Sequence, residues 1–204
     1  MTLMYRLRLY QSLDSYHAHT LKLILMELLN NNCRFDSQVF MELIVCRLCQ
    51  AASYAPIAVS LHFEQILSLM APLDSVCLVR LLLPYVTAPL SADEVRGNTT
   101  DGNTCNQHTR LLALRTLADA VKHLKSSQLI EMLPQISTII LPLFSSPLVD
   151  IRKSVVFVLV EVYMMVGDEL HPFVRDLAPS QRKLLTVYIE RQMNNSPVVQ
   201  SLPS

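Results

Sequence analysis

The sequence contains no tryptophan and only three glycines among its 204 residues. A protein built from sheets with many tight turns normally contains more glycine, because such turns need residues that adopt positive φ angles. The scarcity of glycine therefore favours helices. Charged residues are also few, at 17% of the chain, whereas hydrophobic residues make up 51%. A chain of this length and composition can bury one sizeable core or two small ones.

An excess of charge of either sign is missing as well. Seventeen Lys and Arg residues balance seventeen Asp and Glu residues, so the formal net charge is zero. This balance argues against binding to nucleic acid or to an anionic membrane through a strongly basic surface. We therefore predict neither a nucleic-acid partner nor insertion into a membrane, and we expect local charge clusters to serve a protein partner.

The five cysteines are an odd number, and the start of the chain, MTLMYRLRLYQ, has no signal-peptide pattern. We therefore expect reduced thiols in a cytoplasmic protein. Cys46 and Cys49 form a C-x-x-C pair, but no second Cys or His pair stands at zinc spacing. The pattern favours packing residues on a helix, with a redox or metal site as the alternative, and no cofactor is predicted.

The most apolar stretch runs from Ser154 to Val166 and contains one charged residue, Glu161. It is too short for a bilayer, which needs about 20 residues, and too long for a strand, which has about 5–6. Gly167 follows, where a left-handed cap often ends a helix. A helix that is apolar nearly all round packs on more than one side. One predicted face carries Ile151, Val155, Val158, Leu159, Val162 and Val166, and much of the other carries Val156, Phe157, Val160 and Tyr163.

Helical spacing of apolar residues recurs along the chain and predicts no strand. Asp36 or Ser37 can cap the second helix, Pro56 suits the start of the third, and Asp74 can cap the fourth, VCLVRLLLPYV. "HPFVRDL" is expected to be a short turn or helix. The expected inward residues of the other helices are Leu21, Ile24, Leu25 and Leu28; Val39, Phe40, Leu43 and Ile44; Val59, Phe63, Ile66, Leu67 and Met70; Leu111, Leu114, Ala118 and Val121; Leu129, Met132, Leu133, Ile136, Ile140 and Leu143; and Leu184, Leu185, Tyr188 and Ile189.

Two of the predicted helices share an internal pattern. "LVRLLLPYV" (78–86) and "LIEMLPQIS" (129–137) each contain a leucine–proline step, and each precedes a loop and a second apolar helix. This order is typical of HEAT-type repeats, helix pairs of about 40–47 residues that stack into a solenoid. We predict an all-α solenoid over residues 1–193, with a mobile loop inserted at 88–107 and a disordered tail at 194–204. Because the chain starts in mid-repeat, we expect it to be a C-terminal part of a longer array.

Residues 149–192, VDIRKSVVFVLVEVYMMVGDELHPFVRDLAPSQRKLLTVYIERQ, resemble the extreme C-terminus of the CLIP-associating proteins, the CLASPs. The likeness rests on V-R-K, an apolar helix, G-D-E-L, a proline and K-L-L-x-x-Y-I-x-R. The helices from about 108 to 150 fit the preceding part of that domain. Residues 20–90 match only in helix rhythm and in Arg34–Phe35, and the loop at 88–107 departs from the family as an insertion.

The resemblance implies a TOG-like HEAT domain of a microtubule plus-end regulator. Such a domain docks CLIP proteins, kinetochore motors and cortical or Golgi anchors, while upstream domains hold microtubules and tubulin. The implied location is the cytoplasm and cytoskeleton: microtubule plus ends, spindle, kinetochore and Golgi. The first function hypothesis is therefore a non-catalytic adaptor that tethers partners to microtubule ends. Its candidate partner-binding residues are Arg152, Lys153, Arg182, Lys183 and Arg191.

Asp150 and Arg152 also have a purely structural interpretation. An acid at the start of a helix favours the helix dipole, and the Arg can reach an acid or a carbonyl in an adjacent turn. The alternative is that Arg152 and Lys153 contact an acidic partner.

Other functions are weighed against the adaptor. A tubulin-binding TOG domain would use the loops at about 51–56, 88–107 and 145–151, which present Tyr54, Ser146, Arg152 and Lys153. The absence of tryptophan and the enlarged middle loop argue against it. A generic HEAT scaffold unrelated to microtubules is a further alternative. Catalysis is disfavoured, because His17 and His19 point to different helix faces and neither G-x-S-x-G nor H-E-x-x-H is present.

Overall fold

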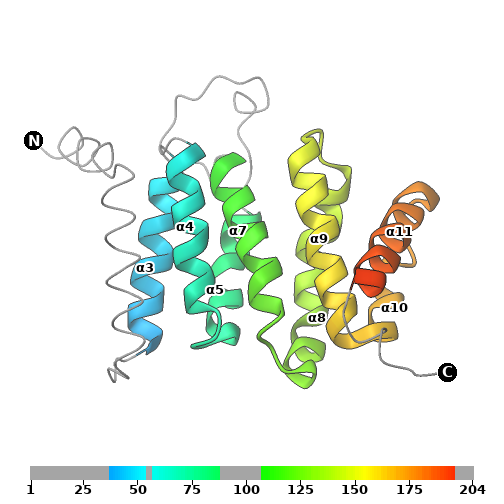
Figure 1. The fold of residues 1–204 in the computed structure, drawn as a ribbon, viewed down its shortest axis with the longest axis horizontal. Helices are drawn as coiled ribbons and strands as arrows, with labels where there is room; N and C mark the ends of the chain where they lie inside the picture. The colour runs from blue at the N-terminus through cyan, green and yellow to red at the C-terminus, as the bar shows by residue number, and fades with distance from the viewer. Residues whose placement is uncertain (1–36, 54–56, 88–106, 196–204) are drawn as a thin grey trace, which may run out of the picture.

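The computed structural model describes residues 37–53, 57–87 and 107–195 (Figure 1). These residues form helices and no strand, which confirms the predicted all-α solenoid. The helices are α3 (Ser37–Ala52), α4 (Ile57–Met70), α5 (Ser75–Thr87), α7 (Gln107–Val121), α8 (Ser126–Ile140), α9 (Val149–Val166), α10 (His171–Val174) and α11 (Pro179–Asn195), with short 3-10 segments η1 (Leu141–Ser145) and η2 (Gly167–Leu170).

The helices form antiparallel pairs, α3/α4, α5/α7 and α8/α9, that stack side by side (Figure 1). Helices α3, α5 and α8 lie in one layer, here called the first layer. Helices α4, α7, α9 and α11 lie in the second layer, which faces the viewer. Each helix touches its own partner and the neighbouring helices of its layer. This two-layer stacking is the arrangement that HEAT-type repeats need to bury their apolar faces.

The core lies between the two layers and follows the predicted apolar spacing. Its largest fully buried side chains are Phe63, Met41, Ile66, Leu67, Met70, Leu78, Leu82, Leu114, Leu117, Leu129 and Leu133. Asp74 caps α5 as expected, because its Oδ1 accepts the Cys77 backbone N–H at 2.9 Å. Pro84 and Pro134 both lie inside helices, one in α5 and one in α8, and both are exposed. The two prolines therefore occupy the same layer in successive repeats.

A pair of hydrogen bonds also repeats from one helix pair to the next. Ser75, the first residue of α5, donates its hydroxyl to the His123 carbonyl at 3.2 Å, just beyond the end of α7. Ser126, the first residue of α8, donates to the Met165 carbonyl at 3.1 Å, at the end of α9. In both pairs the start of the first helix is thus tied to the end of its partner.

Helix α9 is packed on more than one side, as predicted. It lies between α7 and α11 in the second layer and also contacts α8 (Figure 1). The valines Val156 and Val160 are buried along with the predicted core face, except that Val166 of that face is only partly buried. Phe157 is the exception, because its side chain is 50% exposed. It lies on the outer surface of the second layer and was wrongly assigned to a packed face.

Gly167 ends α9 with a φ of +57°, and the predicted glycine stop is confirmed. Its ψ is −128°, however, so the residue does not adopt the left-handed helical conformation that was expected. A Cβ at this position would meet nothing within 4 Å. The requirement for glycine therefore comes from the backbone conformation and not from lack of space.

The apolar stripe predicted for α3 was partly wrong. Val39 and Leu43 are 62% and 55% exposed, and Phe40 and Ile44 are only partly buried. The buried residues are instead Met41, Val45, Leu48, Cys49 and Ala52. Helix α3 is therefore turned about its axis relative to the prediction, so that this second row faces the neighbouring helices α4, α5 and α7. Both rows have helical spacing, so periodicity could not choose between them.

Other boundaries also differ from the predictions. The sixth helix changes to 3-10 geometry at Leu141, and Phe144, which was not predicted to be inward, is buried there. Gln107 is already helical, and α11 continues to Asn195, two residues into the predicted tail. The predicted helix at Leu21–Leu28, the cap at Asp36, Pro56 and most of the 88–107 loop lie outside the described residues.

One described helical segment, Ser126–Ser145, is long and apolar enough to cross a membrane by length and composition alone. The sequence reasoning considered only the later stretch from Ser154 and missed this one. Within the stack the segment packs against α5 and α9, with Leu129, Leu133 and Ile136 buried in the core. Its apolar character is thus used in packing between helices.

Candidate functional site

Arg152 holds the turn between η1 and α9. Its Nη1 donates to the carbonyl oxygens of Ser146 at 2.6 Å and Pro147 at 2.9 Å. The Ser146 side chain also serves this turn, because its Oγ accepts the Leu148 backbone N–H at 3.3 Å. Arg152 thus reaches carbonyls in an adjacent turn, which is the structural role that the sequence suggested. Ser146 is likewise engaged within the turn through both its carbonyl and its hydroxyl.

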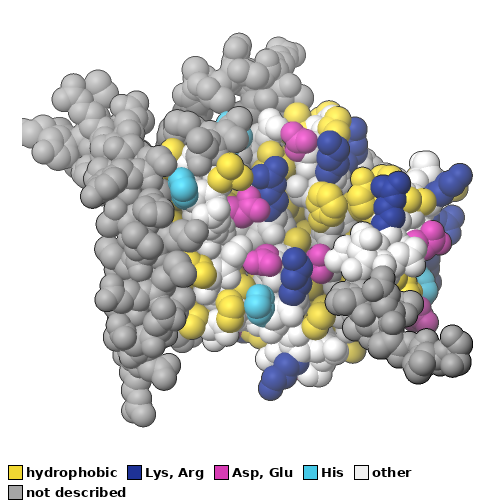
Figure 2. Space-filling view, in the orientation of Figure 1, with side chains coloured by type: hydrophobic (Ala, Val, Ile, Leu, Met, Phe, Trp, Pro, Cys, Tyr) yellow, Lys and Arg dark blue, Asp and Glu magenta, His cyan; other side chains and the backbone are white. Residues whose placement is uncertain are grey.

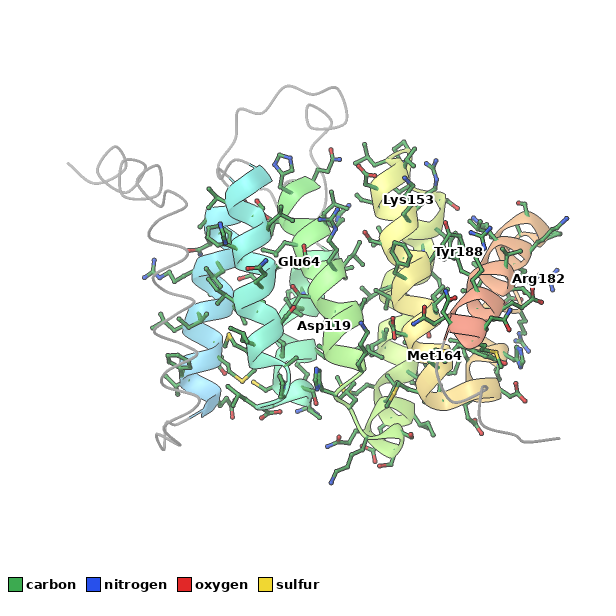
Figure 3. The ribbon with its side chains drawn as sticks, in the orientation of Figure 1. Glu64, Asp119, Lys153, Met164, Arg182 and Tyr188 are labelled. Atoms are coloured by element: carbon green, nitrogen blue, oxygen red, sulfur yellow. The ribbon has the colours of Figure 1, made fainter. Side chains whose placement is uncertain are left out.

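The other basic candidates lie on α9 and α11, and they do not form a single cluster. Lys153 is exposed at the upper end of α9 (Figure 3). On α11, Arg191 stacks over the ring of Tyr188, with its Cζ 5.9 Å from the ring centroid. Lys183 is two residues before the buried Leu185, so helical geometry places it on the opposite side of α11. Arg182 is exposed and lies three residues before Leu185, which places it nearer to the Leu185 side of the helix.

A surface between α9 and α11 combines exposed apolar side chains with two of these cations. Its centre is an edge-to-face contact between Phe157 and Tyr188, with ring centroids 5.8 Å apart. In Figure 2 yellow and dark blue side chains alternate over this part of the second layer. We call this surface the α9–α11 face and define it by Lys153, Phe157, Met164, Leu184, Tyr188 and Arg191.

An open groove lined mostly by polar residues runs across α4, α7 and α9 and borders this face, because Phe157 lines both. Its charges are paired with one another. Arg115 lies 3.4 Å from Glu64, and Lys122 lies 3.5 Å from Asp119 and 3.6 Å from Glu161. These pairs connect α4 to α7 and α7 to α9. Because these opposite charges already form ion pairs with one another, the groove is less suited to a charged partner than the α9–α11 face is.

The ends of the paired helices share one edge of the stack, at the top of Figure 1. The carboxyl ends of α3 and α5 lie there, with the amino ends of α4, α7 and α9. This is the edge that the tubulin-binding alternative requires. Of its predicted residues, Tyr54 lies outside the described residues, Lys153 is free to face solvent, and Ser146 and Arg152 are engaged in the η1–α9 turn.

The cysteines of α3 behave as packing residues. Cys49 is fully buried and Cys46 is half-buried, and neither forms a disulfide with another described cysteine. Burial raises the pKa of the Cys77 thiol, and the carboxylates of Asp74 and Glu42 raise it further against the opposing effect of Arg80. A raised pKa keeps this thiol protonated and weakly nucleophilic near neutral pH. Among the described residues no group of three or more His, Cys, Asp and Glu side chains could hold a metal ion.

Comparison with known proteins gives a consistent result. A region of the chain is 33% identical over 94 residues to CLIP-associating protein 1-A of Xenopus laevis, and 30% identical over 96 residues to CLIP-associated protein of Arabidopsis thaliana. Each match covers 46% of this chain. This region is CLASP-related. The resemblance noted in the sequence is thereby confirmed for close to half of the chain.

Further comparisons define the extent of the likeness. CLIP-associating protein 1 of Xenopus tropicalis is 31% identical over 94 residues. The match spans only 6% of the length of this CLASP and of CLIP-associating protein 1-A, and 7% of the Arabidopsis protein. No family model matches the chain. The activities and partners of the complete CLASPs are therefore a matter for proposal.

Sequence reasoning missed the apolar half of the α9–α11 face. Phe157, Leu184 and Tyr188 were all predicted to be packing residues, and only charged residues were considered as contacts. The available signal was the apolar excess of the α9 helix, which carries more large side chains than one core face needs. Which of them stays exposed depends on where α11 packs, and periodicity does not determine that.

Proposed function

We propose that this chain is a non-catalytic, protein-docking domain of a CLASP-type microtubule regulator. It tethers partner proteins to microtubules by raising their local concentration. The proposed partners are CLIP-type plus-end proteins and kinetochore or cortical anchors, and the proposed locations are plus ends, the spindle, the kinetochore and the Golgi. Microtubules and tubulin would be held through other domains of the longer protein.

The observation that carries this proposal is the CLASP-related region folded as a two-layer helical stack with an exposed apolar and basic face at one end. Phe157 and Leu184 are 50% and 45% exposed there. Large apolar side chains left open in a cluster are typical of protein-interaction surfaces. The names of the relatives describe association with CLIP, and we extend that partner class to this chain.

The test is capture of a CLIP-type protein by the immobilised full-length chain from cell extract, detected with a specific antibody. We expect capture by the folded chain and none by a heat-denatured sample at equal loading. Failure to retain any CLIP-type protein, with circular dichroism showing intact helices, would contradict the docking function.

Tubulin binding is the second candidate, supported by the shared edge of helix ends in Figure 1. Two residues on that edge, Ser146 and Arg152, are engaged in holding their own turn. We therefore expect the chain and purified tubulin to elute separately in size-exclusion chromatography. Co-elution, lost when Lys153 is replaced by Glu, would favour the tubulin-binding function over the adaptor.

A further inference from the structure

We propose that the α9–α11 face binds an acidic amphipathic helix of a partner protein. The helix lies over the Phe157–Tyr188 pair, and its carboxylates reach Lys153 and Arg191. This inference rests on the proposed docking function and deepens it, because it names the surface and the chemistry of the partner.

The apolar part of the face is open but ordered. Phe157, Leu184 and Met164 are 50%, 45% and 37% exposed, although each is a large apolar side chain. The Phe157 ring is held edge-on against Tyr188 at an interplanar angle of 84°. Arg191 lies over the same Tyr188 ring. An aromatic surface that is already positioned loses little conformational entropy when a partner covers it.

The spacing of the apolar side chains suits a helix as the occupant. Phe157 and Met164 are two turns apart on α9, about 10.5 Å at 1.5 Å per residue. Leu184 and Tyr188 are one turn apart on the neighbouring helix α11. Two rows of this kind form a seam that accepts apolar residues at positions i, i+3, i+4 and i+7 of a third helix.

The charge of the face selects an acidic helix. Lys153 lies one turn before Phe157, and Arg191 lies three residues after Tyr188, so cations stand at both ends of the apolar centre. No carboxylate of the described residues forms an ion pair with either of them at 4.0 Å or less. Glu161, one turn after Phe157 on α9, is already paired with Lys122 of α7, and Asp150 lies in the first turn of α9.

The same charges disfavour a second copy of the chain as the occupant. In a two-fold symmetric dimer the face would meet itself, and Lys153 or Arg191 would lie against a cation of the other copy. Like charges opposed across an interface repel each other and disfavour such a dimer. An acidic helix meets the same cations with attraction.

The first test uses two designed peptides of about 18 residues, stapled because short helices are marginal in water. Both carry a leucine stripe at i, i+3, i+4 and i+7 with one tryptophan; one has Glu beside the stripe and its twin has Lys. The chain contains no tryptophan, so only the peptide gives tryptophan emission. We expect a saturable blue shift with the Glu peptide, and affinity at least about tenfold lower, 1.4 kcal/mol, with the Lys twin.

Variants of the chain then locate the site. Phe157→Ala combined with Leu184→Ala should weaken the Glu peptide about tenfold or more. Lys153→Glu combined with Arg191→Glu should reverse the preference, so that the Lys twin binds better. If the reversed variant loses helix content, Lys153→Gln with Arg191→Gln replaces it, and both peptides should then bind about equally.

Matched controls come from elsewhere on the chain. Arg182→Glu changes an exposed cation that lies two and a half helical turns before Arg191, and therefore on the opposite side of α11. Ile130→Ala removes a side chain that is 43% exposed on α8. Neither should change the affinity. Equal binding of both peptides to the natural chain, or equal loss in a control, would overturn the inference. So would sedimentation showing a dimer that Phe157→Ala dissociates.

The inference and the proposed function can fail separately. If the Lys153→Glu, Arg191→Glu chain still retains CLIP-type proteins as the natural chain does, docking stands and this surface is not where it occurs. If the natural chain retains none but binds the Glu peptide through this face, the surface stands and the CLIP-type partner is wrong.

Discussion

At the scale of single residues, Arg152 and Lys153 show that two adjacent cations can differ in role. Arg152 is half-buried and donates to two backbone carbonyls of the η1–α9 turn. Lys153 is exposed and makes no ion pair with a described carboxylate. Reversing both charges together would therefore disturb the turn as well as the surface, and only Lys153 tests binding cleanly.

The first prediction compares these two neighbours. Arg152→Ala should lower the free energy of unfolding by about 1 kcal/mol, the usual net value of a hydrogen bond whose donor is partly exposed. Lys153→Ala should change it by less than about 0.5 kcal/mol, as surface substitutions usually do. Urea denaturation followed by circular dichroism measures both. Equal effects of the two substitutions would show that the carbonyl contacts of Arg152 contribute nothing.

At the scale of secondary-structure elements, α11 is attached to the stack through few buried side chains. Leu185 is its only buried residue, and Tyr188 and Ile189 pack against the core only in part. Gln181 adds one contact at its start, with Nε2 3.5 Å from Ser145 Oγ. The helix nevertheless supplies half of the α9–α11 face, so docking depends on α11 staying in place.

The second prediction separates attachment of α11 from binding. Leu185→Ala should destabilise α11 by roughly 2–3 kcal/mol, the lower part of the range for a buried Leu→Ala change. Hydrogen exchange should then accelerate in residues 179–195 while α7 and α9 keep their protection. Leu184→Ala is the matched control, because that side chain is 45% exposed, and it should leave exchange unchanged. Loss of protection throughout the stack would mean that α11 is not a separate unit.

At the scale of the whole molecule, the stack behaves as a row of helix pairs in which each pair stabilises its neighbours. Helix α7 contacts α3, α4, α5 and α9, whereas α11 contacts chiefly α9 in its layer. Thr109, which is 1% exposed, connects the first two pairs. Its hydroxyl donates to the Cys49 carbonyl at 3.0 Å and lies 2.9 Å from Ser53 Oγ. Such arrays open from their ends because the outer helices have fewer neighbours.

The third prediction concerns this connection. Thr109→Val keeps the shape of the side chain but removes the donor to the Cys49 carbonyl. Leaving a buried polar group without its partner should lower the free energy of unfolding by about 1–3 kcal/mol. We expect faster hydrogen exchange in α3 and α4, while α8 and α9 are nearly unchanged. Exposed Thr186→Val on α11 is the control. Uniform acceleration in all helices would show that the chain unfolds as one cooperative unit.

The sequence by itself determined the class of fold and most of the core. Apolar residues at helical spacing, the scarcity of glycine and the proline-containing helices were enough to predict paired helices in a stack, because burial of one apolar stripe per helix leaves few other arrangements. The residues after Val149 also carried enough of a motif to suggest the CLASPs. The end of α9 at Gly167 and the cap of α5 at Asp74 were also predicted, because helix ends depend on residues that are adjacent in sequence.

Only the tertiary structure decided which face of an apolar helix is left open. Helix α3 has two rows of apolar residues, and its neighbours selected Met41 and Val45 over Val39 and Leu43. Helix α9 is apolar nearly all round, and the placement of α11 left Phe157 exposed beside Tyr188. Periodicity records that a side chain is apolar, but exposure depends on what packs against it, and that is set by residues distant in sequence.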